Sequence, residues 1–256
     1  MALSSITGYA STVVVTFSAN NVTPLGVTPV DGLHFAGKTG TVNQVKTGNG
    51  GGSYTASSLT AFDGTSTGIT LVTGAGACGD GGYLRESALK DSHDSSNTNK
   101  FFDVFGEDMA VGQNYGGCIN KQTEGFTMQL QGLSSGSYTL TMLVGRNNVY
   151  GTASSTYSLS GVTGVSVNIL DYSAGISSSI VDNGVTLDVG QPSELPGEWA
   201  LVEYTFTSIT DNTTLSLNIN GSGNIGALAL ASVPEPATAS LGLLGLGVLL
   251  MRRRRA

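Results

Sequence analysis

The fold is decided by the stretch Leu133-Ser-Ser-Gly-Ser-Tyr-Thr-Leu-Thr-Met-Leu-Val144. Between Tyr138 and Met142 every second side chain is apolar and the others are threonine, which is the pattern of a β-strand with one buried face. The residues in front of it form a turn signal, because serine and glycine accept the backbone geometry of tight turns. The sequence therefore predicts a turn at 133–136 that leads into a strand over 137–144.

Similar short stretches of alternating or β-branched residues recur along the chain, separated by turn signals rich in Asp, Asn and Gly. Only residues 83–91 have much helical propensity. Many strands at hairpin spacing with almost no helix predict an all-β fold, a single antiparallel β-sandwich of jelly-roll form. The predicted strands cover 13–17, 68–73, 126–131, 137–144, 164–170, 184–189, 201–207, 214–220 and 226–233, and the predicted turns 61–64, 133–136, 181–184, 210–212 and 220–223.

The composition limits the classes of protein that the chain can belong to. It has 256 residues, of which 39% are hydrophobic and 11% charged. This suffices for the core of one large β domain. The net charge is -7, so the body offers no basic surface for phosphates, and nucleic acid is not expected as a partner. The acidic, lysine-poor composition indicates an extracellular or envelope protein.

Two cysteines, Cys78 and Cys118, lie in glycine-rich surroundings. In an exported protein such a pair is expected to form a disulfide. In the chain-entropy account, closing a loop of about 40 residues stabilises the domain by about 3–4 kcal/mol. A zinc site is the alternative, but there is no CxxC motif, and His34 and His93 lack ligand spacing relative to either cysteine. We therefore predict a disulfide and neither a metal nor a cofactor.

The densest polar segment is the acidic 86–108 region. It offers carboxylates and His93 for glycosidase-like chemistry, although the run Asp-Ser-His-Asp-Ser-Ser-Asn-Thr-Asn from Asp91 favours a solvated loop. Its oxygen ligands lack the Asp-x-Asp-x-Asp-Gly order of a calcium loop. No Gly-x-Ser-x-Gly elbow is present either. We expect no enzyme activity, and a glycan-acting hydrolase that uses these acidic residues is the alternative.

A candidate ligand rim follows the strand that ends near Val144. Sugars stack on exposed aromatic faces, while amide side chains form hydrogen bonds with the hydroxyl groups of the sugar. An ordinary polar loop is the alternative interpretation of this segment. Trp199, at the start of a later strand, is a further aromatic candidate for sugar binding, with a position in the core as the alternative. The rim comprises Arg146, Asn147, Asn148 and Tyr150.

The C-terminal tail combines an uncharged run over 237–251 with four arginines behind it. As a helix the run measures about 22 Å, which is short of the roughly 30 Å hydrocarbon core of a bilayer. The arginines place the C-terminus on the cytoplasmic side. The tail is thus predicted to be a short transmembrane helix with a marginal span. A transient stay in the membrane fits it better than a permanent anchor, which is the alternative.

The tail resembles the PEP-CTERM sorting signal of Gram-negative bacteria. That signal joins a Pro-Glu-Pro motif, a short transmembrane helix and an arginine-rich end. The resemblance implies recognition by an exosortase, a membrane-embedded cysteine transpeptidase that cuts near the motif, and an association with exopolysaccharide and biofilm. The matching residues are Pro234, Glu235 and Pro236 in the motif and Arg252, Arg253, Arg254 and Arg255 in the basic stop.

The first ten residues have no basic or long apolar stretch, but they end like a cleavage site. Gly8 and Ala10 are small residues at the minus-three and minus-one positions of a cut before Ser11. We interpret residues 1–10 as the remnant of a longer signal peptide, with an ordinary flexible terminus as the alternative. The predicted organisation is then 1–10 signal remnant, 11–231 β-sandwich domain and 232–256 sorting segment.

The body is similar to galactose-binding-like jelly rolls. The similarity lies in the strand that starts at Gly136, in the strand from Trp199 to Phe206 and in the apolar last strand over 226–233. That last strand has no acidic residue, so calcium is not inferred. Together these observations predict an exported, non-enzymatic protein of the cell envelope, outer surface or extracellular matrix. It is expected to be anchored transiently in the inner membrane, then cleaved, with polysaccharide as a candidate partner.

Overall fold

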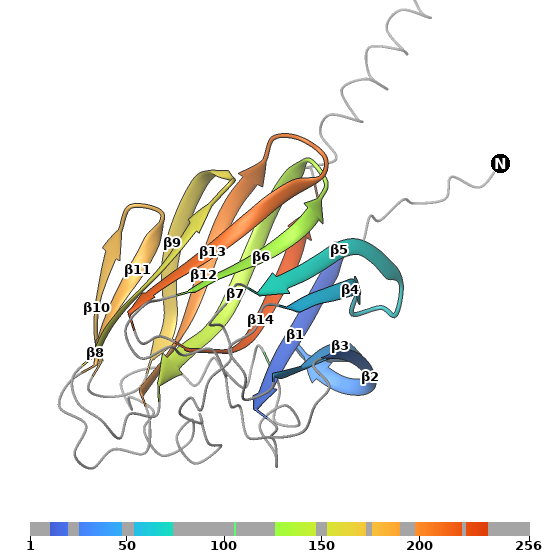
Figure 1. Ribbon diagram of the computed structural model, residues 1–256, viewed down its shortest axis with the longest axis horizontal. Coiled ribbons are helices and arrows are strands. Elements are labelled where there is room, and N and C mark those ends of the chain that lie inside the picture. Colours follow the sequence, from blue (N-terminus) through green and yellow to red (C-terminus); the bar gives the residue numbers. More distant parts are fainter. Residues whose placement is uncertain are drawn as a thin grey trace, which may run out of the picture.

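The part of the chain that the structure describes forms a β-sandwich of two seven-stranded sheets that face each other (Figure 1). The first sheet has the order β2-β3-β1-β14-β7-β12-β9 and the second β10-β11-β8-β13-β6-β5-β4. All neighbours are antiparallel except β1 and β3, which run parallel. The computed structural model describes residues 11–19, 26–47, 54–73, 105, 126–146, 153–172, 176–189, 198–221 and 224–234.

The strands of each sheet have the following bounds. The first sheet comprises β1 (Thr12–Ala19), β2 (Gly26–Phe35), β3 (Lys38–Thr47), β7 (Gly136–Arg146), β9 (Thr163–Tyr172), β12 (Glu198–Ser208) and β14 (Asn224–Val233). The second comprises β4 (Tyr54–Thr60), β5 (Ser66–Thr73), β6 (Phe126–Leu133), β8 (Ala153–Ser160), β10 (Ile176–Val181), β11 (Gly184–Val189) and β13 (Thr213–Gly221).

The predicted all-β sandwich is confirmed, and each of the nine predicted strands lies within an observed one. Five further strands, namely β2, β3, β4, β8 and β10, were not predicted. The jelly-roll form and the galactose-binding-like fold stay predictions. Residues 83–91, with the expected helical propensity, and residues 1–10 lie outside the described residues.

The core between the sheets follows the period-two pattern of the strands. On β7 the buried side chains of Tyr138, Leu140 and Met142 point inward, as the alternation predicts. The Tyr138 ring stacks on that of Phe206 from β12 at a centroid distance of 5.5 Å. Each large apolar side chain buried here contributes about 1.5–3 kcal/mol. The second sheet supplies Met128, Leu130, Tyr157, Leu159, Leu215, Leu217 and Ile219 from the other side.

Two buried polar side chains join the sheets. Asn43 on β3 is fully buried, and its Nδ2 donates to the carbonyl oxygens of Val14 (3.0 Å) and Thr60 (2.7 Å). Its Oδ1 accepts from the Thr60 N–H at 2.9 Å, so the amide binds both backbone groups of the last β4 residue. The Tyr204 hydroxyl on β12 donates to the Tyr157 carbonyl on β8 at 2.9 Å. Burial raises the pKa of Tyr204, and Tyr157 adds to the rise.

The first sheet is also buried on part of its outer face. Val14, Leu143 and Leu201 point away from the inter-sheet core and contact one another there, since they alternate with core residues along their strands. Phe105, the one residue of 74–125 that the structure describes, is fully buried against this cluster. Phe35 and Phe62 pack at its margin.

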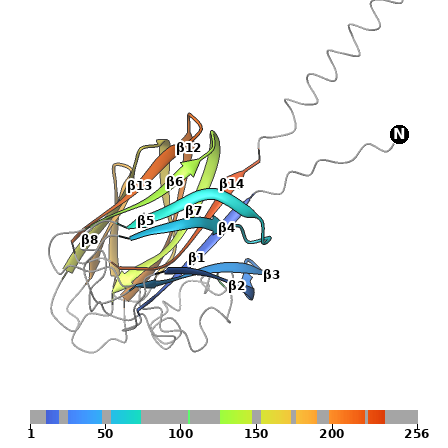
Figure 2. The ribbon, with the colours of Figure 1, turned by 45° about the vertical axis from the view of Figure 1, so that its right-hand side comes forward.

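The hairpin turns that the structure describes lie at corresponding ends of their strands, and in Figures 1 and 2 those among β6 to β13 are at the top while those of β2–β3 and β4–β5 are at the right. The strand register requires this placement, because Gly136 pairs with Ser208 and Val233 with Ser137. We call this the tight-turn end. It holds the turns at 36–37, 61–65, 134–135, 161–162, 182–183 and 209–212 together with Ser11 and Pro234. At the opposite end the strands lead into residues outside the described ranges.

The Asn43 bridge yields a test of how the sheets are held together. Asn43→Ala leaves the N–H and carbonyl of Thr60 without their side-chain partner, so we expect the free energy of unfolding to fall by about 2–4 kcal/mol. Asn168→Ala is the matched control because Asn168 is exposed on β9. Urea unfolding followed by circular dichroism measures both changes. Equal stability of the two variants contradicts the assignment.

Candidate functional site

The first and last described strands are hydrogen-bonded to each other at the tight-turn end. Thr12 on β1 pairs with Ala231 on β14. Beyond this pair the Ser232 N–H donates to the Ser11 carbonyl at 3.0 Å, and the Ser11 N–H donates to the Ser232 Oγ at 3.0 Å. On its other side β14 pairs with β7 as far as Val233 and Ser137. The chain is therefore fixed in place up to Val233.

Pro234 ends this ladder. Proline has no N–H and cannot continue the pairing, so a strand in the middle of a sheet stops before it. Val233 is the last residue of β14, and Pro234 is exposed directly behind it. The sandwich and the predicted sorting segment thus meet without a spacer.

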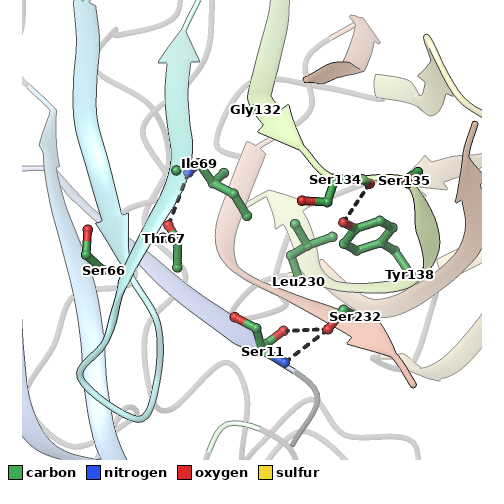
Figure 3. A pocket seen from close by; sticks show the side chains of 11 residues that line it. Ser11, Ser66, Thr67, Ile69, Gly132, Ser134, Ser135, Tyr138, Leu230 and Ser232 are labelled. Atoms are coloured by element: carbon green, nitrogen blue, oxygen red, sulfur yellow. Dashed lines mark hydrogen bonds between the residues drawn. The ribbon is translucent and has the colours of Figure 1, made fainter. Parts of the chain in front are cut away.

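A cavity of about 310 Å³ lies beside this junction (Figure 3). Its wall is rich in hydroxyl groups, and the Tyr138 hydroxyl donates to the Ser134 carbonyl at 2.9 Å. Burial raises the pKa of Tyr138, and the nearby Asp211 carboxylate adds to the rise. The cavity is lined by Ser11, Ser66, Thr67, Gly68, Ile69, Gly132, Ser134, Ser135, Tyr138, Leu230 and Ser232.

Asp211 fixes the rim of this cavity from the turn at 209–212. Its Oδ1 accepts from the Ser135 N–H at 2.8 Å and from the Ser135 hydroxyl at 3.1 Å. These two hydrogen bonds lower the pKa of Asp211 below its ordinary value of 3.8. The carboxylate therefore ties the β12–β13 turn to the β6–β7 turn.

A second pocket, of about 540 Å³, lies at the same end beside the outer face of the first sheet. The rings of Phe35 and Phe62 meet edge to face at 5.7 Å in its wall. Phe62 is held from both sides, because its N–H donates to the Thr12 carbonyl at 2.7 Å and its carbonyl accepts from the Thr41 N–H at 2.9 Å. Polar groups complete the wall, which comprises Thr12, Phe35, Ala36, Lys38, Thr39, Phe62 and Asp63.

Local geometry explains why a glycine precedes Thr41. A Cβ at Gly40 would lie 2.2 Å from the Phe62 carbonyl oxygen, so only glycine lets the β4–β5 turn approach β3 this closely. In the same turn Asp63 accepts from the Thr65 hydroxyl at 2.6 Å and from its N–H at 2.9 Å. These bonds lower the pKa of Asp63 and fix it as a charged group at the pocket rim.

Comparison with known families adds the decisive observation at the junction. Residues 232–255 match the family model described as the PEP-CTERM protein-sorting motif. The C-terminus carries a PEP-CTERM sorting signal. The match begins at Ser232, inside β14, and includes the predicted motif at 234–236 and the arginines 252–255. Comparison with curated proteins and with solved structures gives no match.

A PEP-CTERM signal implies an exported or surface protein that an exosortase processes. The structure describes Pro234 and ends there, so the run over 237–251 lies outside it. Among the described residues no helix is long and apolar enough to cross a membrane. The short transmembrane helix and the transient anchoring in the inner membrane therefore stay predictions.

The other predicted site residues fall mostly outside the described ranges. Arg146 is the last residue of β7, where it pairs with Glu198 at the end opposite the tight turns. Cys78, Cys118, the acidic residues of 86–108 and the rim residues Asn147, Asn148 and Tyr150 are not described. The disulfide and the ligand rim stay predictions. In the described part no three His, Cys, Asp or Glu side chains are grouped so that they could hold a metal ion.

Sequence reasoning did not identify either cavity. Their walls combine segments that are far apart in the chain, and in the first of them Ser11 meets Ser232. No local pattern marks such a pair. The turn signal at 61–64 is the one feature that pointed toward the second pocket, since it predicted the turn that carries Phe62 and Asp63.

Acid unfolding tests the Asp211 contact. A carboxylate with a lowered pKa stabilises the folded protein above its unfolded value of 3.8, and this contribution disappears as the pH falls through the lower folded value. We therefore expect Asp211→Asn to lose less stability than the natural protein on going from neutral pH to below 3.8. Urea midpoints across this range measure it. Ser135→Ala, which removes one of the two donors, is expected to lie in between, and parallel curves for all three proteins contradict the assignment.

Proposed function

We propose that this chain is the precursor of a β-sandwich protein of the cell surface or extracellular matrix, which an exosortase cuts at or beside residues 234–236. The observation that carries the proposal is the coincidence of two boundaries. The folded ladder ends at Val233, and the sorting match starts at Ser232. A cut behind Val233 therefore removes the sorting segment and leaves every strand of the sandwich in place.

The position of β14 makes this boundary important. β14 lies between β1 and β7, and Ile225, Leu228 and Leu230 are buried in the core. A cut inside the strand would expose the edges of both neighbours and open the core. The arrangement therefore favours cleavage behind Val233, where Pro234 is exposed.

Mass spectrometry of the protein isolated from its host tests this proposal. We expect a mature form whose C-terminus lies within or next to residues 234–236 and which lacks Arg252 to Arg255. A host without exosortase and a variant with Pro234→Ala and Pro236→Ala are the controls, and both are expected to accumulate the uncut chain. Intact arginines in the natural envelope form would contradict processing.

We also propose carbohydrate as the ligand of the mature body, bound in the second pocket, whose wall contains Phe35 and Phe62. Partly exposed aromatic rings beside charged and hydroxyl groups suit a sugar, whose apolar face stacks while its hydroxyl groups bind the polar rim. Lys38, Thr39 and Asp63 supply these groups. We propose binding and display in place of catalysis. The hydrolase alternative depends on acidic residues of 86–108, which lie outside the described residues and lend it no support.

A glycan array distinguishes this pocket from the rim that the sequence predicts. Lys38→Ala and Asp63→Asn are expected to weaken binding about tenfold or more, since each removes a charged partner of the sugar hydroxyls. Asp182→Asn, an exposed acidic residue in another tight turn, is the matched control. Loss of binding in Tyr150→Ala alone would place the ligand at the predicted rim. No binding across a broad array would overturn the carbohydrate proposal.

A further inference from the structure

Within the described ranges, the large apolar side chains that stay exposed lie at the tight-turn end. Among the described residues these are Ile180 (63% exposed), Val181 (39%), Ile209 (69%) and Val233 (46%). Ile180 and Val181 end β10, Ile209 lies in the β12–β13 turn and Val233 ends β14. All four therefore lie at the tight-turn end. Elsewhere the described surface leaves no comparably large apolar side chain exposed.

These residues form three separate points and not one patch. On the first sheet β14 and β12 are two strands apart, which is about 10 Å. On the second sheet β13 and β10 are three strands apart, which is about 14 Å. The three apolar points are spread over both sheets, so a partner that contacts all of them has to extend across this end of the sandwich.

The chain itself indicates which partner this is. The sorting segment leaves from the same end, and β14 is paired up to Val233. Fully extended, the four residue steps from Val233 to Ala237 span at most about 14 Å. The uncharged run over 237–251 starts there. When this run enters a bilayer, the tight-turn end is held against the lipid surface.

We propose that the tight-turn end is a bilayer-docking surface, on which Ile180, Val181, Ile209 and Val233 contact the lipid that the C-terminal segment enters. This rests on the proposed function of that segment. The attraction to lipid comes from the apolar side chains and not from charge. The exposed charges of this end are mainly acidic, with Asp63, Asp182 and Asp211 against Lys38. Anionic lipid therefore weakens the contact. The opposite end of the sandwich, where Arg146 lies, points away from the membrane.

Docking links processing to ligand access. Both cavities open at the tight-turn end, and Ser232 lies in the wall of the smaller one. In the uncut precursor the bilayer covers this end. Cleavage behind Val233 releases it, so the pocket lined by Phe35 and Phe62 becomes accessible in the mature protein.

The single native tryptophan allows a direct test with the full chain. Trp199 is the second residue of β12 and lies ten residues before Ile209, which follows the end of this strand, so it is about 33 Å from the tight-turn end. The protein is reconstituted in phosphatidylcholine vesicles with brominated acyl chains, which quench tryptophan at short range. In a Trp199→Phe background, we expect Ile209→Trp and Ile180→Trp to lose most of their fluorescence. Trp199 of the natural protein is the built-in control and is expected to keep its fluorescence.

Each other outcome overturns a defined part of the proposal. If the chain floats with the vesicles but neither introduced tryptophan is quenched, docking is wrong and membrane entry of the sorting segment stands. If the chain does not float, membrane entry fails and docking fails with it. If neither introduced tryptophan is quenched in the vesicles but the emission of both shifts to the blue when an exosortase is added, that enzyme is the occupant and lipid docking is overturned. Quenching of Trp199 to the same degree overturns the orientation.

Discussion

The pairing of the first strand with the last is the constraint on which the rest of the structure depends. Because β14 enters the sheet between β1 and β7, it completes the core and also fixes the place where the chain leaves the sandwich. The Ser11 and Ser232 hydrogen bonds extend this pairing to the last position that the proline permits. The sorting signal is therefore held by a rigid strand, and no flexible linker separates it from the body.

Among the described residues, the two sheets are held by a largely apolar core that a few polar side chains bridge. Each of these side chains is buried, so its hydrogen bonds matter for the stability of the fold. A buried amide or hydroxyl that lost its partner would cost about 1–3 kcal/mol. Asn43 avoids this cost by binding three backbone groups, and Tyr204 by donating to Tyr157. Both bridges tie the sheets at defined points, so the tight-turn end keeps the geometry on which its two pockets depend.

Much of the fold was predictable because the central strands carry one clean apolar face. Three of the five missed strands are edge strands that lack such a face: β2 contains Pro29 and Gly32, half of β10 is serine with an exposed surface, and β4 is the edge at the other side of the second sheet. The other two, β3 and β8, lie inside their sheets. An edge strand is specified mainly by its neighbour's free backbone groups, and these leave no pattern in its own sequence. The sorting signal was predictable for the opposite reason, since it is read as a contiguous segment. The pockets join distant segments, so no periodicity reveals them.

The internal position of β14 also links the folding of the sandwich to the presentation of the sorting signal. Residues 224–233 are the last part of the sandwich, and until they are available β1 and β7 have unpaired edges and an open core. Such edges invite pairing with other chains. Since the match over 232–255 begins inside this strand, the segment that completes the sheet is continuous with the one that is sorted. A body that has closed around β14 therefore presents its signal at the tight-turn end, where a cut leaves the closed sheet intact.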